Sequence, residues 1–133
     1  MATTEYWQKQ ALVSFQNKAE SNNIDFKREL TEDIERLKEH INAFGNLPGG
    51  GLFIFGVNRD YSFFDQDIKQ DKIIEKVTSI AHDSQTPPLR AIVHHLAILS
   101  RSLLAIEIAP SSQLPVFIRS RDPWRNGAFK RRG

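Results

Sequence analysis

Residues 43–57 have the sequence AFGNLPGGGLFIFGV, in which the end of a helix, a glycine-rich turn and an apolar strand follow one another. The helix is predicted because apolar residues upstream recur at intervals of three and four positions: Ile34, Leu37, Ile41 and Phe44. Thr31 is the predicted cap of this helix. Residues 52–57 form an uninterrupted apolar run, which is typical of a central strand covered on both faces.

The glycine triplet at 49–51 has two interpretations. A phosphate-binding loop leads from a strand into a helix and carries a Lys followed by a Ser or Thr. The triplet leads instead from a helix into a strand, and no such Lys follows it. We therefore interpret it as a tight backbone turn against a packed sheet.

The rest of the sequence adds two helices and four strands. Alternating residues predict a short strand at Ile24–Lys27, with Ile24 and Phe26 on its buried face. Apolar periodicity predicts helices over 5–17, capped by Thr4, and 67–82; an antiparallel hairpin is predicted over 91–99 and 103–109, and a last strand over 116–118. This order predicts an α+β fold, in which about three helices pack on a mixed sheet of four to five strands.

Length and composition indicate one globular domain over residues 1–133. The chain is 40% hydrophobic and has 9 Phe, which is enough apolar material for a core and excludes a disordered chain. With 0 Cys, the sequence excludes disulfides, thiolate metal sites and iron–sulfur clusters. It contains neither a signal-peptide pattern nor an apolar run of membrane-spanning length, so no membrane contact and a cytoplasmic location are expected.

Positive charge is concentrated at the C-terminal end. Residues 115–133 hold six bases and one acid, a net charge of +5, whereas the rest of the chain has a net charge of −3. Bases interleaved with aromatic residues suit a nucleic acid, because cations neutralise phosphates and aromatic faces stack on bases. The alternative is a solvated tail. The candidate nucleic-acid-binding residues are Arg119, Arg121, Trp124, Arg125, Lys130, Arg131 and Arg132.

Three carboxylates near strand ends form a second candidate site. Glu20 and Asp25 precede and begin the first predicted strand, and Asp60 follows the central strand. Such a group can hold a divalent metal that activates water against a phosphodiester. An offset of five residues places two side chains on opposite faces of a regular strand, so convergence of Glu20 and Asp25 requires irregular backbone. The alternative is a set of ordinary surface acids. None of the 4 His has a metal-ligand spacing, and a structural role is expected for them.

The ordered series of motifs is similar to the Schlafen/Alba-type DNA-binding domain. The similarity starts in residues 20–27 (ESNNIDFK), continues through 43–50 (AFGNLPGG) and 55–57 (FGV), and ends in 127–133 (GAFKRRG). It spans about residues 19–133. The resemblance implies a nucleic-acid-binding module found at the start of larger bacterial transcriptional regulators, so we expect a fragment of a longer protein whose downstream domains are partners.

Related Schlafen domains are endoribonucleases, which implies a catalytic alternative. The positions that correspond to the acidic residues of those enzymes are Glu20, Asp25 and one near Asn58. In this alternative the cofactor is Mg²⁺ or Mn²⁺, and Lys27 lies near the scissile phosphate. This sequence departs from that pattern: Arg59 occupies the position of the third acid, Asp60 comes one residue later, and Tyr61 replaces a glycine. An Arg in a metal site repels the ion.

Three hypotheses follow. The first is a non-catalytic nucleic-acid (DNA)-binding module of a transcriptional regulator, with no cofactor. The second is a divalent-metal-dependent nuclease that uses Glu20, Asp25 and Asp60 as ligands. The third is a protein-interaction or sensor module, whose working face is the acidic majority of the surface. Homodimer formation is left open by all three.

Overall fold

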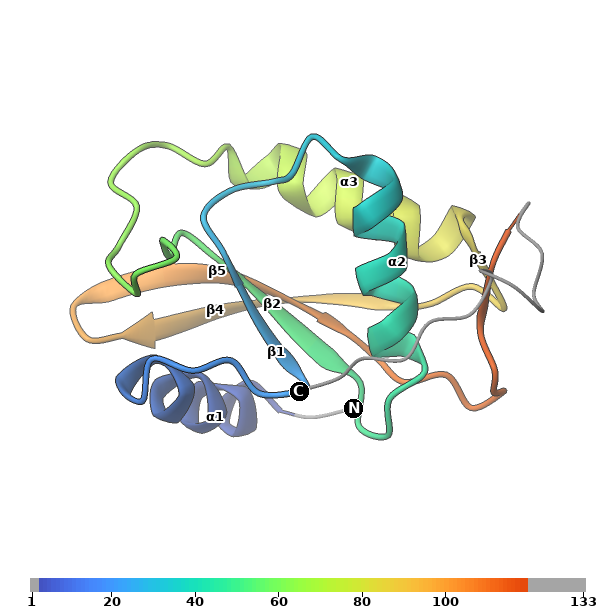
Figure 1. Cartoon of the computed structure of the whole chain (residues 1–133), viewed down its shortest axis with the longest axis horizontal. Coiled ribbons are helices and arrows are strands. Elements are labelled where there is room, and N and C mark those ends of the chain that lie inside the picture. Colours follow the sequence, from blue (N-terminus) through green and yellow to red (C-terminus); the bar gives the residue numbers. More distant parts are fainter. Residues whose placement is uncertain (1–2, 120–133) are drawn as a thin grey trace.

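The computed structural model describes residues 3–119, and its helices lie on both faces of one sheet (Figure 1). The helices are α1 (Thr4–Gln16), α2 (Ile34–Gly45) and α3 (Gln70–Asp83). The strands are β1 (Ile24–Lys27), β2 (Gly51–Phe55), β3 (Gln85–Thr86), β4 (Ala91–Ile98), β5 (Arg101–Ile108) and β6 (Phe117–Ile118). The predicted α+β class is confirmed.

The main sheet is mixed and four-stranded, with the strand order β1-β2-β5-β4. β2 is central: it pairs in parallel with β1 and antiparallel with β5, as its uninterrupted apolar run predicts. β4 and β5 form the expected hairpin. The last predicted strand does not join this sheet, because β6 pairs with β3, a two-residue strand that the sequence analysis missed.

Alternation along the strands gives the sheet two apolar faces. Leu52 and Ile54 of β2 pack towards α1 with Trp7, whereas Phe53 and Phe55 pack towards α2 and α3. The sheet is therefore the middle layer of three. Within the described part of the chain, no helix has the length and apolarity required to cross a membrane.

The glycine triplet forms the tight turn that was predicted. Gly50 has φ +73°, in the left-handed region, and a Cβ there would overlap the carbonyl oxygen of Ile108. A Cβ on Gly51 would overlap the ring of Phe44. The turn therefore needs glycine because α2 and β2 approach each other closely.

Helix starts differ from the predictions. Thr3, and not Thr4, caps α1, since its side chain accepts a hydrogen bond from the Tyr6 N–H at 3.1 Å. Asp33, and not Thr31, caps α2 by accepting from the Arg36 N–H at 3.1 Å. α3 starts at Gln70, three residues later than predicted.

Buried polar side chains connect α2 to β3 and β6. The fully buried Asn42 donates through Nδ2 to Gln85 Oε1 and to the Val116 carbonyl, both at 2.9 Å. Asn46 also bonds to Val116, through both ends of its side-chain amide. These contacts fix the backbone at the start of the basic C-terminal stretch.

A second buried contact joins β4 and β5. The Nε2 of His94 lies 2.9 Å from Oε1 of Glu107, and both side chains are buried. Nδ1 of the same ring lies 2.8 Å from the hydroxyl oxygen of Thr4, at the start of α1. The geometry is that of a structural histidine.

Candidate functional site

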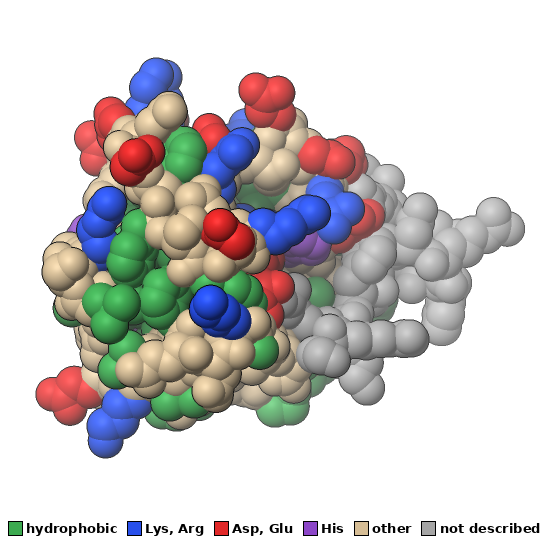
Figure 2. Space-filling view, turned by 60° about the vertical axis from the view of Figure 1, so that its left-hand side comes forward, with side chains coloured by type: hydrophobic (Ala, Val, Ile, Leu, Met, Phe, Trp, Pro, Cys, Tyr) green, Lys and Arg blue, Asp and Glu red, His purple; other side chains and the backbone are tan. Residues whose placement is uncertain are grey.

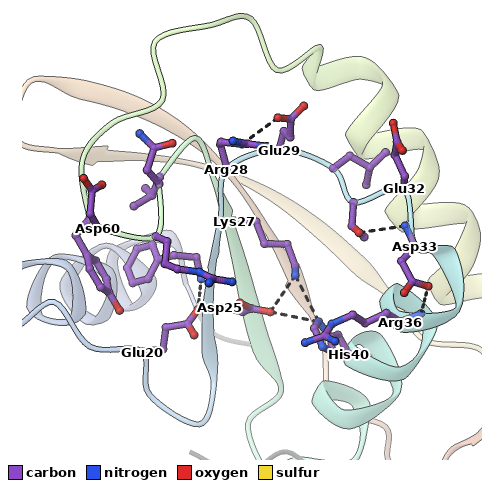
Figure 3. A pocket seen from close by; sticks show the side chains of 17 residues that line it. Glu20, Asp25, Lys27, Arg28, Glu29, Glu32, Asp33, Arg36, His40 and Asp60 are labelled. Carbon is purple, nitrogen blue, oxygen red and sulfur yellow. Dashed lines mark hydrogen bonds and ion pairs between the residues drawn. The ribbon is translucent and has the colours of Figure 1, made fainter.

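A groove of about 1450 Å³ opens where β1 ends (Figure 3). Three segments form its walls: the end of β1 with the loop to α2, the first turns of α2, and the loop that follows β2. Its charged or titratable lining residues are Glu20, Asp25, Lys27, Arg28, Glu29, Glu32, Asp33, Arg36, His40, Arg59, Asp60 and Tyr61. The groove thus brings the four predicted catalytic residues, Glu20, Asp25, Lys27 and Asp60, to one region of the surface.

Asp25 is buried at the floor of the groove, so β1 is covered on both faces and not only on the face of Ile24 and Phe26 that the sequence predicts. Its Oδ2 lies 3.4 Å from Nζ of Lys27 and 3.5 Å from Nδ1 of His40. Ile24 is fully buried on the other face, but Phe26 is only half-buried. Alternation places Asp25 and Lys27 on the face that α2 covers, where His40 meets them.

Glu20 and Asp60 are both held by local hydrogen bonds. Oε2 of Glu20 accepts from the backbone N–H of Phe26 at 2.6 Å. Oδ1 of Asp60 accepts from the backbone N–H of Ser62 at 3.1 Å and from its hydroxyl. The Ser62 hydroxyl and backbone N–H are the main causes that lower the pKa of Asp60 below its ordinary value.

These carboxylates do not form a metal-ligand cluster. Figure 3 shows Glu20 and Asp25 on opposite sides of β1, with Asp60 farther away on its own loop. Across residues 3–119, no group of three or more His, Cys, Asp or Glu side chains is arranged to hold a metal ion. Because Asp25 is ion-paired and Arg59 lines the same groove, the donor set does not fit a divalent metal in this structure.

Two arginines face the groove without a counter-ion in the described part of the chain. Arg36 on α2 and Arg59 after β2 are both exposed, and neither guanidinium forms an ion pair within residues 3–119. Arg28 differs, because its Nε lies 3.0 Å from Oε2 of Glu29 while its guanidinium lies over the ring of Phe64. Arg36 and Arg59 are therefore available to an anion in the groove.

Tyr61 lies at the rim of the groove in an unusual conformation. Its φ of +63° is in the left-handed region, which a bulky residue rarely adopts. Its ring contacts Phe15 and Phe26 edge to face, at centroid distances of 6.3 and 5.6 Å. Burial first, and then the negative charge of Glu20, raise the pKa of the Tyr61 phenol above its ordinary value.

Of the predicted basic residues, only Arg119 is described. Its backbone N–H donates to the Ser84 carbonyl at 2.8 Å, and its Nη1 donates to the Asp83 carbonyl at 3.3 Å. Arg119 is thus attached to the end of α3. The other candidates lie outside the described residues: Arg121, Trp124, Arg125, Lys130, Arg131 and Arg132.

Sequence reasoning missed Arg36 and His40 as groove residues. Both lie on the polar side of an amphipathic helix, where charged residues are ordinary. Their role depends on the packing of α2 beside β1, which no local pattern reveals. Arg59 and Tyr61 could have been singled out from the sequence, because both depart from the motif that the sequence otherwise resembles.

The fold and groove define an α+β domain of the Schlafen/Alba type. The family model described as "Schlafen, AlbA_2" matches residues 20–133. The chain therefore belongs to this family, as its motifs predict. No curated protein matches the sequence.

Two solved structures share the fold. The N-terminal domain of a protein from Nitrosomonas europaea, described as related to the ATP-dependent DNA helicase RecG, matches with a TM-score of 0.61 and 20% identity over 100% of this chain and 90% of its own. The DIP2311 protein from Corynebacterium diphtheriae matches with a TM-score of 0.50 and 19% identity over 89% of this chain. The match spans 25% of DIP2311, so there the fold is one part of a larger protein.

Proposed function

We propose that this domain binds nucleic acid, with the groove at the end of β1 and the basic C-terminal stretch as its contact surfaces. The observation that carries the proposal is the pair Arg36 and Arg59, which face one groove without a counter-ion among residues 3–119. Guanidinium groups bind phosphates through paired hydrogen bonds, and sites of this kind provide affinity without sequence specificity.

The groove lining has six acids against four Lys and Arg side chains, so phosphate binding there depends on the placement of Arg36 and Arg59 and not on the net charge. The side chains of Asp33 and Asp60 accept hydrogen bonds from backbone N–H groups, and Asp25 is paired with Lys27. These local donors hold the carboxylates in place but leave them charged, whereas the two arginines form no ion pair within residues 3–119. Family membership and the helicase-related description of the Nitrosomonas europaea protein support the same proposal.

The finer proposal is that this domain serves a transcriptional regulator in the cytoplasm and acts on DNA. In such a protein the domain supplies affinity for the phosphate backbone. Sequence specificity then comes from other domains, because phosphate contacts carry no sequence information.

The test is a fluorescence-anisotropy titration with labelled duplex DNA, single-stranded DNA and structured RNA at several salt concentrations. We expect binding that weakens steeply with salt, because each neutralised phosphate releases counterions. A variant with Lys130→Gln, Arg131→Gln and Arg132→Gln should show a shallower salt dependence. Absence of binding to all three nucleic acids at low ionic strength would refute the proposal.

The same RNA samples, incubated with Mn²⁺ and run on a denaturing gel, test the nuclease alternative. The proposal expects intact strands, because the groove carboxylates are spread over both sides of β1. Cleavage that disappears in Glu20→Ala would instead assign catalysis to these acids.

A further inference from the structure

Half-buried aromatic rings surround one end of the groove. Phe26 and Tyr61 line the groove itself, and Phe63 lies next to them against the buried Phe15. The rings of Phe15 and Phe63 are stacked, with centroids 5.2 Å apart and planes 12° apart. We call Phe26, Tyr61 and Phe63 the aromatic rim. Figure 2 brings this end of the molecule forward and shows hydrophobic side chains gathered on it, with charged side chains around them.

Arginines already lie on aromatic rings at this end. The guanidinium of Arg101, at the start of β5, lies 5.2 Å from the ring centroid of Phe63. The guanidinium of Arg28 lies 5.3 Å from the ring centroid of Phe64. Both arginines are exposed. The planar guanidinium groups therefore extend the ring surfaces outward and add positive charge beside them.

The conformation of Tyr61 is costly and places its ring in the rim. A left-handed conformation costs a non-glycine residue about 1–2 kcal/mol, and Tyr61 has φ +63°. The main-chain turn would form more easily with glycine. What the tyrosine adds is a second ring beside Phe26 in the lining of the groove. Backbone strain of this kind is often found at functional sites, where the position of the side chain is required for function.

We propose that the aromatic rim is a stacking platform for the unpaired bases of a single-stranded nucleic acid, whose phosphates lie along the groove beside Arg59 and Arg36. The rings of Phe26 and Tyr61 and the guanidinium over Phe63 suit bases that are exposed on one strand, because every base has a face that can stack. A paired duplex keeps its bases stacked inside and presents only phosphates to this surface. The proposal rests on the proposed function and adds the form of nucleic acid that the groove prefers.

The experiment compares three labelled probes of equal length: a thymine single strand, the same backbone with abasic sites, and a duplex. The proteins are the full chain, Tyr61→Phe, which keeps the ring, and Tyr61→Leu, which keeps only apolar volume. Tyr6→Leu is the matched control, because Tyr6 is an exposed tyrosine on α1 outside the rim. Thermal unfolding of each variant checks that the fold is retained.

We expect the full chain and Tyr61→Phe to bind the thymine strand about ten-fold more tightly than the abasic strand, from the stacking of one base. Tyr61→Leu should lose that preference and bind the abasic strand unchanged, while Tyr6→Leu should behave like the full chain. Equal affinity of the full chain for thymine and abasic strands would overturn the stacking platform and leave the proposed function intact. Failure to bind any probe at low salt would overturn both.

A second measurement does not depend on the variants. Titration of the full chain with the thymine strand should shift the NMR signals of aromatic ring protons upfield, because a stacked base shields them. The abasic strand should leave those signals in place. If both strands shift backbone signals of the groove but neither shifts the ring protons, phosphates bind without base stacking and the inference is wrong.

Discussion

The side-chain amide of Asn46 forms hydrogen bonds with both the N–H and the carbonyl of Val116. Its Oδ1 accepts from the Val116 N–H at 2.8 Å, and its Nδ2 donates to the Val116 carbonyl at 3.1 Å. An asparagine can do this because its amide offers one acceptor and two donors. This contact joins the end of α2 to the start of the basic C-terminal stretch.

Replacing Asn46 should therefore destabilise the domain. In Asn46→Ala, the N–H of the buried Val116 loses its acceptor, at a cost of about 1–3 kcal/mol, whereas the Val116 carbonyl keeps its bond from Asn42. Urea unfolding followed by circular dichroism measures the difference. Asn58→Ala is the matched control, because the Asn58 amide donates to the exposed Ser62 hydroxyl. Equal stability of the two variants would show that the contact with Val116 does not contribute to the free energy of unfolding.

The turn before β2 should not tolerate a side chain. Gly51→Ala inserts a methyl group into the space of the buried Phe44 ring, and overpacking of this kind costs about 1–3 kcal/mol. Gly49→Ala meets no atom within 4 Å, so only its left-handed backbone adds strain. The midpoint temperature of thermal unfolding should be lower for Gly51→Ala than for Gly49→Ala. The reverse order would contradict the close approach of α2 to β2.

The stability of the domain should depend on His94 and Glu107 together. His94→Leu removes the imidazole from the buried Glu107 side chain, and the loss of a buried hydrogen-bond partner costs about 1–3 kcal/mol. The double variant with Glu107→Leu should lose less stability than the two single changes together, as a double-mutant cycle in urea would show. His82→Leu is the control, because His82 and its partner Asp83 are both exposed and their contact contributes little. Strict additivity would mean that the two groups do not interact.

The Tyr61 phenol should ionise at a higher pH than an ordinary tyrosine. Burial and the charge of Glu20 raise its pKa above 10.0, so the folded state holds this proton more tightly than the unfolded state does. The associated stability is complete below pH 10 and is lost as the pH rises through the folded-state pKa. Ultraviolet difference spectra of the Tyr6→Phe variant follow this group alone. Glu20→Gln should lower the pKa towards its ordinary value, and an unchanged titration curve would exclude the electrostatic contribution of Glu20.

Much of the fold could be predicted from local patterns. The central position of β2 follows from its apolar run, and the bounds of β1 agree with the predicted Ile24–Lys27. The hairpin turn is shorter than predicted, because β5 already begins at Arg101 and only Leu99 and Ser100 separate the strands. β3 was missed because two residues of strand carry no periodicity, and its formation depends on pairing with β6.

The site was less predictable than the fold. Glu20, Asp25, Lys27 and Asp60 do share one groove, but their exact relation depends on which side of β1 each carboxylate occupies. The irregular backbone before Ile24 lets Glu20 return to the Phe26 N–H instead of joining Asp25. Arg36 and His40 reach the groove through the packing of α2 against the sheet. Such tertiary placement cannot be deduced from residue spacing.

The central claim is that phosphates bind in the groove beside Arg36 and Arg59. The most direct test measures duplex-DNA affinity against salt concentration for the full chain, for the double variant Arg36→Gln with Arg59→Gln, and for Arg90→Gln, which removes an exposed arginine outside the groove. The double variant should bind more weakly, and the slope of log affinity against log salt should become shallower by about 1.8, the value for two lost phosphate contacts. Arg90→Gln should match the full chain. A double variant with the affinity and slope of Arg90→Gln would contradict the claim.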